Sequence, residues 1–147
     1  MIQGLGDLNL SLIMAAIGSA FGTGAAGMAA IGAWKKGFLQ NKAAPFIMVA
    51  FVGAPLTQIF YGFILRDKIQ AAGLPSDPGS VVLQALIGLS AGAAMGFSAY
   101  MQGKAAAKAC DALAETGKGF ANYMLVLGII ETVALFVMIL SMIALPG

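Results

Sequence analysis

The chain has 147 residues, of which 60% are hydrophobic and only 10% are charged, and its mean hydropathy is +0.91. A soluble domain usually carries about 25% charged residues, so this composition excludes an ordinary soluble protein and favours a membrane protein. The net charge of +2 is too small to indicate nucleic-acid binding, and one cysteine without any histidine excludes a disulfide framework and argues against a zinc or haem site.

Four apolar segments are each long enough to cross a bilayer. An α-helix needs about 20 mostly apolar residues for this, and helices satisfy their own backbone polar groups in hydrocarbon. We therefore predict an all-α membrane protein with four transmembrane helices, arranged as two helical hairpins over residues 1–72 and 73–147. The opening MIQGLGDLN contains an acid and no basic residue, unlike a cleaved secretory signal, so the first helix is expected to stay in the mature chain. The predicted helices cover about residues 8–34, 43–66, 79–113 and 118–145.

Basic residues concentrate in the first and third connections, whereas the second contains only Arg66 and Lys68. By the positive-inside rule, the first and third connections face the cytoplasm and both termini lie outside, in the cell (inner) membrane if the source is prokaryotic. Charged loops over residues 35–42 and 104–118 would offer a surface to a soluble partner, although a merely solvated tip fits the same charges. The basic residues of the two cytoplasmic connections are Lys35, Lys36, Lys42, Lys104, Lys108 and Lys118.

The two hairpins resemble each other when the chain is shifted by about 70 to 75 residues. In this alignment Leu56 lies opposite Glu131, so a duplicated first half would have lost its acid. Glycine matches also arise by chance in a glycine-rich chain, and that origin stays open. Small residues recur every four positions on the first and third helices, which predicts close packing between them and suits a closed ring of copies. These residues are Gly18, Gly22 and Ala26 on the first helix and Gly88, Gly92 and Gly96 on the third.

Glu131 is the one acid inside any of the four apolar segments. It lies about 12 residues into the fourth helix, or roughly 18 Å, which is near the middle of a hydrocarbon layer about 30 Å thick. An unpaired charge there costs roughly 3 kcal/mol or more, so this carboxylate indicates a function in transport. The alternative is a protonated acid that only holds helices together.

The second helix places polar groups on one face. Ala54, Thr57, Gln58 and Tyr61 stand at positions i, i+3, i+4 and i+7. Pro55 has no N–H and is expected to kink the helix, freeing nearby carbonyl oxygens, including that of Ala54. Hydrogen bonding between helices alone is the alternative explanation of this polar face.

Gln102 completes the set if the third helix continues into the cytoplasm and turns near Thr116 and Gly117, because Gln102 and Glu131 then come level across the hairpin. A carboxylate, two amides, a hydroxyl and a main-chain oxygen form an all-oxygen ligand set, which suits a hard cation. A single carboxylate is neutralised by one monovalent cation. Sodium is favoured because a dehydrated ion needs about five ligands, but a proton would also neutralise the site.

These residues resemble a known family, the proteolipid (rotor-ring c or K subunit) of V-type rotary ATPases in its duplicated four-helix form. In sodium-translocating members the ion is held at the positions of Thr57, Gln58, Gln102 and Glu131, with a main-chain oxygen at Ala54. Tyr61 corresponds to the tyrosine that locks the glutamate. The motifs that carry the resemblance are GSAFGTGAAG, APLTQIFYG, FSAYMQGKAAA and IIETVAL, one in each helix.

The resemblance implies a ring of copies that turns in lipid beside a stator subunit with an arginine, with soluble rotor subunits at loops 35–42 and 104–118. The sequence contains no P-loop, so nucleotide chemistry would lie elsewhere. We therefore expect a non-catalytic subunit without an organic cofactor, which carries Na⁺ or H⁺ only as the transported ion. One carboxylate per four helices moves fewer ions per turn and favours pumping over synthesis.

Two other classes of function share part of this pattern. A small multidrug exporter also packs four helices around one membrane glutamate, but its acid is expected near the N-terminus with aromatic residues lining a drug cavity. A structural pore or assembly protein is the third possibility, and Glu131 would then be dispensable.

Overall fold

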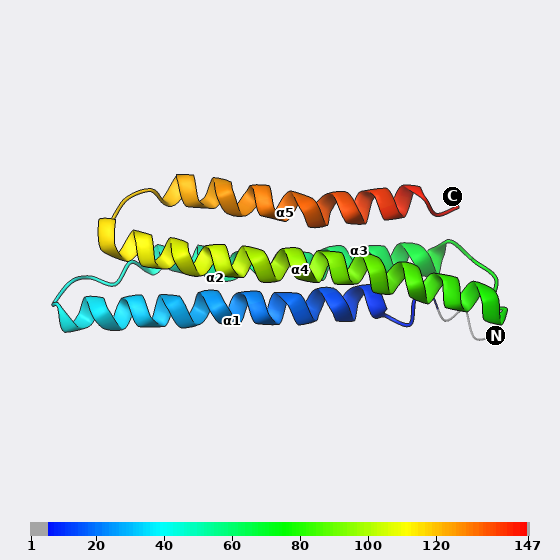
Figure 1. The fold of residues 1–147 in the computed structure, drawn as a ribbon, viewed down its shortest axis with the longest axis horizontal. Helices are drawn as coiled ribbons and strands as arrows, with labels where there is room; N and C mark the ends of the chain where they lie inside the picture. Colours follow the sequence, from blue (N-terminus) through cyan, green and yellow to red (C-terminus); the bar gives the residue numbers. More distant parts are fainter. Residues whose placement is uncertain (1–5, 147) are drawn as a thin grey trace.

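The computed structural model describes residues 6–146. Over this range four helical segments are long and apolar enough to cross a membrane, and none of these residues forms a strand (Figure 1). The predicted all-α, four-helix membrane fold is confirmed, and the chain is an integral, multi-pass membrane protein. The segments are α1 (Leu10–Leu39), a second composed of η1 (Phe46–Met48), α2 (Val49–Gly53), η2 (Ala54–Leu56) and α3 (Thr57–Ala71), then α4 (Pro78–Thr116) and α5 (Phe120–Ile143).

The helix ends differ from the predicted ones for local reasons. The first helix starts later because Leu8 and Asn9 have φ values of 56° and 61°, which a helix does not allow. It ends later, at Leu39, because the helix continues through Lys35, Lys36 and the next three residues, beyond the uncharged run on which the predicted end was based. α4 continues to Thr116 and stops at Gly117, whose φ of 65° is the left-handed conformation common after a helix.

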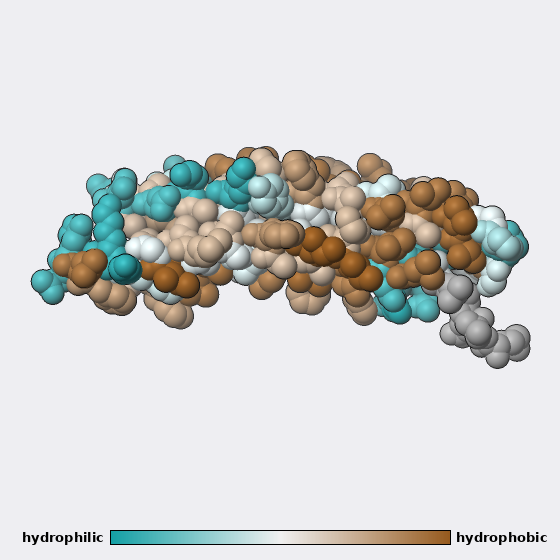
Figure 2. Space-filling model, turned by 60° about the horizontal axis from the view of Figure 1, so that its bottom comes forward, coloured by the Kyte–Doolittle hydropathy of each residue, from teal (hydrophilic) through white to brown (hydrophobic). Residues whose placement is uncertain are grey.

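The helices run alternately up and down along one long axis. Figure 1 shows the α1–η1 and α4–α5 connections at one end, and the start of α1, the end of α5 and the α3–α4 connection at the other. The first and third connections therefore lie on the same side of the bundle. In Figure 2 the hydrophilic residues gather toward the two ends and apolar residues cover most of the middle, as a protein that spans a bilayer requires.

α1 and α4 form the most extensive helix pair, and glycine makes their close approach possible. A Cβ added to Gly18 would lie 1.9 Å from the carbonyl oxygen of Gly96, and one added to Gly103 would lie 2.2 Å from the Cα of Gly22. Side chains at these positions would overlap the backbone of the other helix. The spacing of small residues in the sequence predicts this contact, and the two backbones do meet along it.

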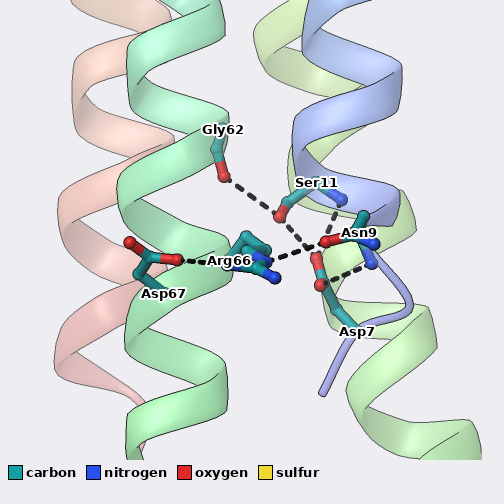
Figure 3. A network of polar contacts seen from close by, with 6 residues as sticks. All are labelled: Asp7, Asn9, Ser11, Gly62, Arg66 and Asp67. Carbon is teal, nitrogen blue, oxygen red and sulfur yellow. Dashed lines mark hydrogen bonds and ion pairs between the residues drawn. The ribbon is translucent and has the colours of Figure 1, made fainter. Parts of the chain in front are cut away.

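A polar network fastens the start of α1 to α3 (Figure 3). Asp7 is buried, with 1% of its surface exposed, and its carboxylate accepts hydrogen bonds from the backbone N–H groups of Asn9 (3.0 Å) and Ser11 (2.8 Å) and from the Ser11 hydroxyl. The same hydroxyl lies 3.1 Å from the Gly62 carbonyl oxygen on α3. Arg66 donates to the Asn9 side chain at 2.8 Å. Residues 7–9 are therefore folded back against the bundle, at the end where α1 begins.

Two apolar clusters fill the core, with a polar layer between them. One cluster contains Phe51 and Leu127, and the other contains Leu65 and Ala134. Ser19 on α1, Gln58 on α3, and Ser98 and Gln102 on α4 lie between the members of the two clusters, whereas Ser11 and Gln84 lie nearer the end of the bundle at which α1 begins. The fold therefore places this layer at mid-height of the spanning segments.

Candidate functional site

The second membrane segment is interrupted where the polar layer begins. Pro55 cannot donate a backbone hydrogen bond, and residues Ala54–Leu56 form a 3₁₀ turn between α2 and α3. The Thr57 hydroxyl lies 3.2 Å from the carbonyl oxygen of Ala54 and also 3.2 Å from Oε1 of Gln58. A break caused by proline thus gathers a main-chain oxygen, a hydroxyl and an amide oxygen within one turn.

Two glutamine side chains connect α3 to α4 in the centre of the bundle. Gln58 and Gln102 both have 0% of their surface exposed. The Gln58 side-chain amide donates to Oε1 of Gln102 at 2.8 Å. Buried side-chain amides require hydrogen-bond partners, and each of these two glutamines is a hydrogen-bond partner of the other. The third helix does extend into the hydrophilic end of the bundle, which brings Gln102 level with the residues of α3 and α5.

Glu131 projects from α5 toward this pair, and its side chain is half-buried. The Tyr61 hydroxyl donates to Oε1 of Glu131 at 2.6 Å. Nε2 of Gln102 lies 3.3 Å from the other carboxylate oxygen. Both carboxylate oxygens therefore contact neutral donors, one from α3 and one from α4.

The hydrogen bonds of α4 also reach the backbone of α5. Nε2 of Gln102 lies 3.0 Å from the Leu127 carbonyl oxygen, and the Ser98 hydroxyl donates to the Ile130 carbonyl oxygen at 2.9 Å. Ser98 is not predictable as a site residue, because a serine in an alanine-rich and glycine-rich helix carries no pattern that separates it from its neighbours. One available signal is its position one turn before Gln102, which puts both on the same face.

The six candidate site residues predicted from the sequence are joined in one series of contacts. Leu56, the residue aligned with Glu131 in the first hairpin, takes no part, and 42% of its surface is exposed. The first hairpin therefore contributes neutral polar groups, and the second contributes Gln102 and the carboxylate. The series runs from the Ala54 carbonyl through Thr57, Gln58 and Gln102 to Glu131, and it ends at Tyr61.

The electrostatics of the site rest on one ionisable carboxyl group. Among residues 6–146 the three ion pairs involve other acids, namely Asp67, Asp111 and Glu115, and none includes Glu131. An ionised carboxylate in hydrocarbon is costly without a countercharge. Neutral oxygen groups around it are able to solvate a small cation, and a proton on the carboxyl would remove the charge instead.

The geometry defines a class of protein: a four-helix membrane protein with one carboxyl group held in a buried, oxygen-rich polar layer. Residues 85–144 match the family model that describes the ATP synthase c subunit. The match covers less than half of the chain, essentially α4 and α5, and it includes Ser98, Gln102 and Glu131. A comparison with curated proteins gives no match. The second hairpin is thus similar to an ATP synthase c subunit, and this similarity supports a rotor proteolipid that translocates ions.

Proposed function

We propose that this chain is the sodium-carrying proteolipid of a V-type rotary ATPase, with Glu131 as the group that carries the ion. The observation that supports this most strongly is the unbroken series of contacts between Glu131 and the neutral oxygen groups of α3 and α4. The proposal assigns no catalysis to the chain itself. ATP hydrolysis or synthesis would take place on soluble subunits.

The ligand set supports sodium as the coupling ion. Besides the carboxylate, the site offers the Ala54 carbonyl, the Thr57 hydroxyl and the side-chain oxygens of Gln58 and Gln102. Together with the carboxylate these make five oxygen-bearing groups, which is about the number that a dehydrated sodium ion needs in place of water. A proton would require only the carboxyl and one partner. H⁺ as the coupling ion in the same rotor is the second candidate, and it requires only Glu131 and Tyr61.

Charge balance explains how the site can face lipid. With one monovalent cation bound, the carboxylate and the ion together are neutral, so the loaded site can move through the apolar part of the membrane without the cost of a bare charge. The Tyr61 hydroxyl at 2.6 Å from Oε1 holds the carboxylate in its closed position. Unloading would require an external positive charge, such as an arginine of a stator subunit, to compete for Glu131.

Assembly into a ring is part of the same proposal. Copies of the chain would pack side by side, with α1 and α4 inside and the α3 and α5 faces turned outward to lipid. The hydrophilic connections 35–42 and 104–118 lie at one end of the bundle, where the soluble rotor subunits of the cytoplasmic side would attach. Because the first hairpin has Leu56 in place of an acid, each copy would move one ion per four helices. Each ion would then receive more of the free energy of ATP than in a ring with one carboxylate per two helices. This arrangement favours pumping.

The geometry disfavours the multidrug exporter. An exporter needs its carboxylate inside a drug-sized cavity. A groove of about 490 Å³ does lie between α1 and α4, and aromatic residues such as Phe21 and Phe97 line it, but Glu131 is not among its lining residues. The carboxylate instead lies among amide and hydroxyl groups between α3, α4 and α5.

Carbodiimide labelling tests the proposal, since this reagent modifies a protonated carboxyl in an apolar site. The purified, detergent-solubilised protein should be labelled at Glu131, and NaCl should prevent the labelling when KCl keeps the ionic strength constant. Equal protection by potassium, or none by either salt, would reject sodium and leave the proton version. Glu131→Gln should abolish ion flux in the assembled ATPase, whereas Asp67→Asn, which removes an ion pair with the neighbouring Arg66 at the end of the bundle where α1 begins, should not.

Two pairs of variants test the ligand assignment. Gln102→Leu should weaken protection by sodium, whereas Gln84→Leu should not, because Gln84 lies on the same helix but donates to the Pro75 carbonyl at the outer end. Thr57→Ala should likewise weaken protection. Thr132→Ala is its control, since the Thr132 hydroxyl bonds only within its own helix. Unchanged sodium protection in both Gln102→Leu and Thr57→Ala would refute the ligand set.

A further inference from the structure

Ser98 stands one turn from the ion ligand Gln102 on the face of α4 that meets α5. It is 5% exposed, and its hydroxyl donates to the Ile130 carbonyl oxygen at 2.9 Å. Ile130 is the residue immediately before Glu131 in the chain. The bond therefore ends on the peptide group from which Glu131 projects.

A second bond of the same kind lies one turn away. Gln102 donates to the Leu127 carbonyl oxygen at 3.0 Å. Ser98 and Gln102 are four residues apart on α4, about 6 Å along its axis, and their acceptors are three residues apart on α5, about 4.5 Å. Because the helices are antiparallel, the two bonds together fix how far α5 can slide along α4.

Apolar packing within the chain gives α5 little other restraint. Only Leu127, Ala134 and Met138 of α5 are buried. Alanine has a small side chain and methionine an adaptable one, so neither defines a single axial position for the helix. Directional hydrogen bonds to the backbone of α5 can fix its axial position.

We propose that Ser98 is a positioning residue for the ion site: its bond to the Ile130 carbonyl sets the height of Glu131 relative to Gln102 and Tyr61. This inference rests on the proposed ion-carrying function and adds a residue to it. Without the Ser98 bond, Gln102 becomes the only side-chain link to the α5 backbone while also contacting the carboxylate. Glu131 would then sample positions in which its two oxygens no longer meet both donors, and the affinity for the cation would fall.

The test compares Ser98→Thr with Ser98→Val in the intact oligomer, since the two side chains have nearly the same volume and only threonine has a hydroxyl. The sodium concentration that half-protects Glu131 from carbodiimide should rise about threefold to tenfold in Ser98→Val and in Ser98→Ala, the range expected for one hydrogen bond between membrane helices. Ser98→Thr should stay close to the wild-type protein. Ser90→Ala is the matched control, because the Ser90 hydroxyl is exposed and bonds within α4 to the Ile87 carbonyl.

Mass and thermal stability of the oligomer separate positioning from a general structural role. The proposal expects the valine and threonine variants to assemble and melt alike while differing in sodium protection. Equal half-protection in these two variants would overturn it, as would a loss that parallels a loss of assembly. If sodium protects neither the wild-type protein nor any variant, the sodium assignment fails. The rate at which carbodiimide labels Glu131 then tests the positioning role by itself. A faster rate in Ser98→Val than in Ser98→Thr supports that role, and equal rates reject it.

Discussion

Replacement of Gly18 by alanine should separate α1 from α4. The added Cβ would lie 1.9 Å from the carbonyl oxygen of Gly96, whereas ordinary van der Waals contact begins at 3.4 Å, so the two atoms must move apart by about 1.5 Å. The obstacle is backbone in the middle of a long helix, which no side-chain rotation can relieve. Gly18→Ala also gains up to about 1 kcal/mol of helix propensity.

Overpacking of a close contact usually costs about 1–3 kcal/mol, and backbone overlap lies at the upper end of that range. We therefore expect Gly18→Ala to lower the free energy of unfolding of the detergent-solubilised oligomer by about 1–3 kcal/mol, measured by denaturant titration of helical circular dichroism. Gly103→Ala should behave similarly, because its Cβ would meet the backbone of Gly22 at 2.2 Å. Gly24→Ala is the control, with no atom within 4 Å of its added Cβ, and it should be neutral or stabilising. If Gly18→Ala proves as stable as Gly24→Ala, the close approach of α1 and α4 is wrong.

Three further outcomes can be measured. Asp7→Ala removes the acceptor of three hydrogen bonds at a buried position and should lower the free energy of unfolding by about 1–3 kcal/mol in the same titration. Hydrogen bonds from Ser80 hold the pKa of the Asp77 carboxyl below its ordinary value of 3.8, so its support for the start of α4 is complete above that value and is lost as the pH falls through the lowered pKa. Amide exchange at the α4 start, corrected for the intrinsic rate, should show this loss, and Asp77→Asn should remove the dependence on pH. Tyr61→Phe removes the donor at 2.6 Å from Glu131 and should raise the rate of carbodiimide labelling without sodium about threefold to tenfold, whereas an unchanged rate would show that the hydroxyl does not restrain the carboxylate.

Much of the polar layer is predictable because helical periodicity is a local property. The spacing of Ala54, Thr57, Gln58 and Tyr61 places them on one face whatever they meet, and Pro55 predicts the interruption that the structure has as a 3₁₀ turn. Their closeness to Glu131 requires only that antiparallel helices of known length be laid side by side. The roles of these residues in binding an ion remain predictions for the labelling experiments.

The end of the bundle at which α1 begins is not predictable in this way. Asp7 precedes the apolar run, and no sequence pattern indicates that its carboxylate is buried. The positive φ values of Leu8 and Asn9 fold residues 7–9 back, and the Asp7 carboxylate fits where Gly88 has no side chain: a Cβ there would lie 2.3 Å from Oδ2 of Asp7. This placement depends on a contact between residues far apart in the sequence. Ser98 is not predictable for a related reason, because its hydrogen-bond acceptor is a backbone carbonyl, and no sequence pattern indicates which carbonyl it will bond.

The contrast between α4 and the second membrane segment bears on how the proposed ion site would both hold and release its ion. α4 is continuous over Pro78–Thr116 and packs backbone to backbone against α1, so Gln102 and Ser98 are presented from a rigid layer. The second segment is broken at Ala54–Leu56, and α5 buries few of its side chains. In the proposed cycle, therefore, Glu131 on α5 and Tyr61 on α3 move. The amide of Gln102 on α4 stays in place, and the Glu131 carboxylate returns to it when the site closes. Opening the site would break the contacts of Glu131 with Tyr61 and Gln102 but leave the packing of α1 against α4 intact. Each copy would therefore exchange its ion without loosening the contacts that hold its two hairpins together.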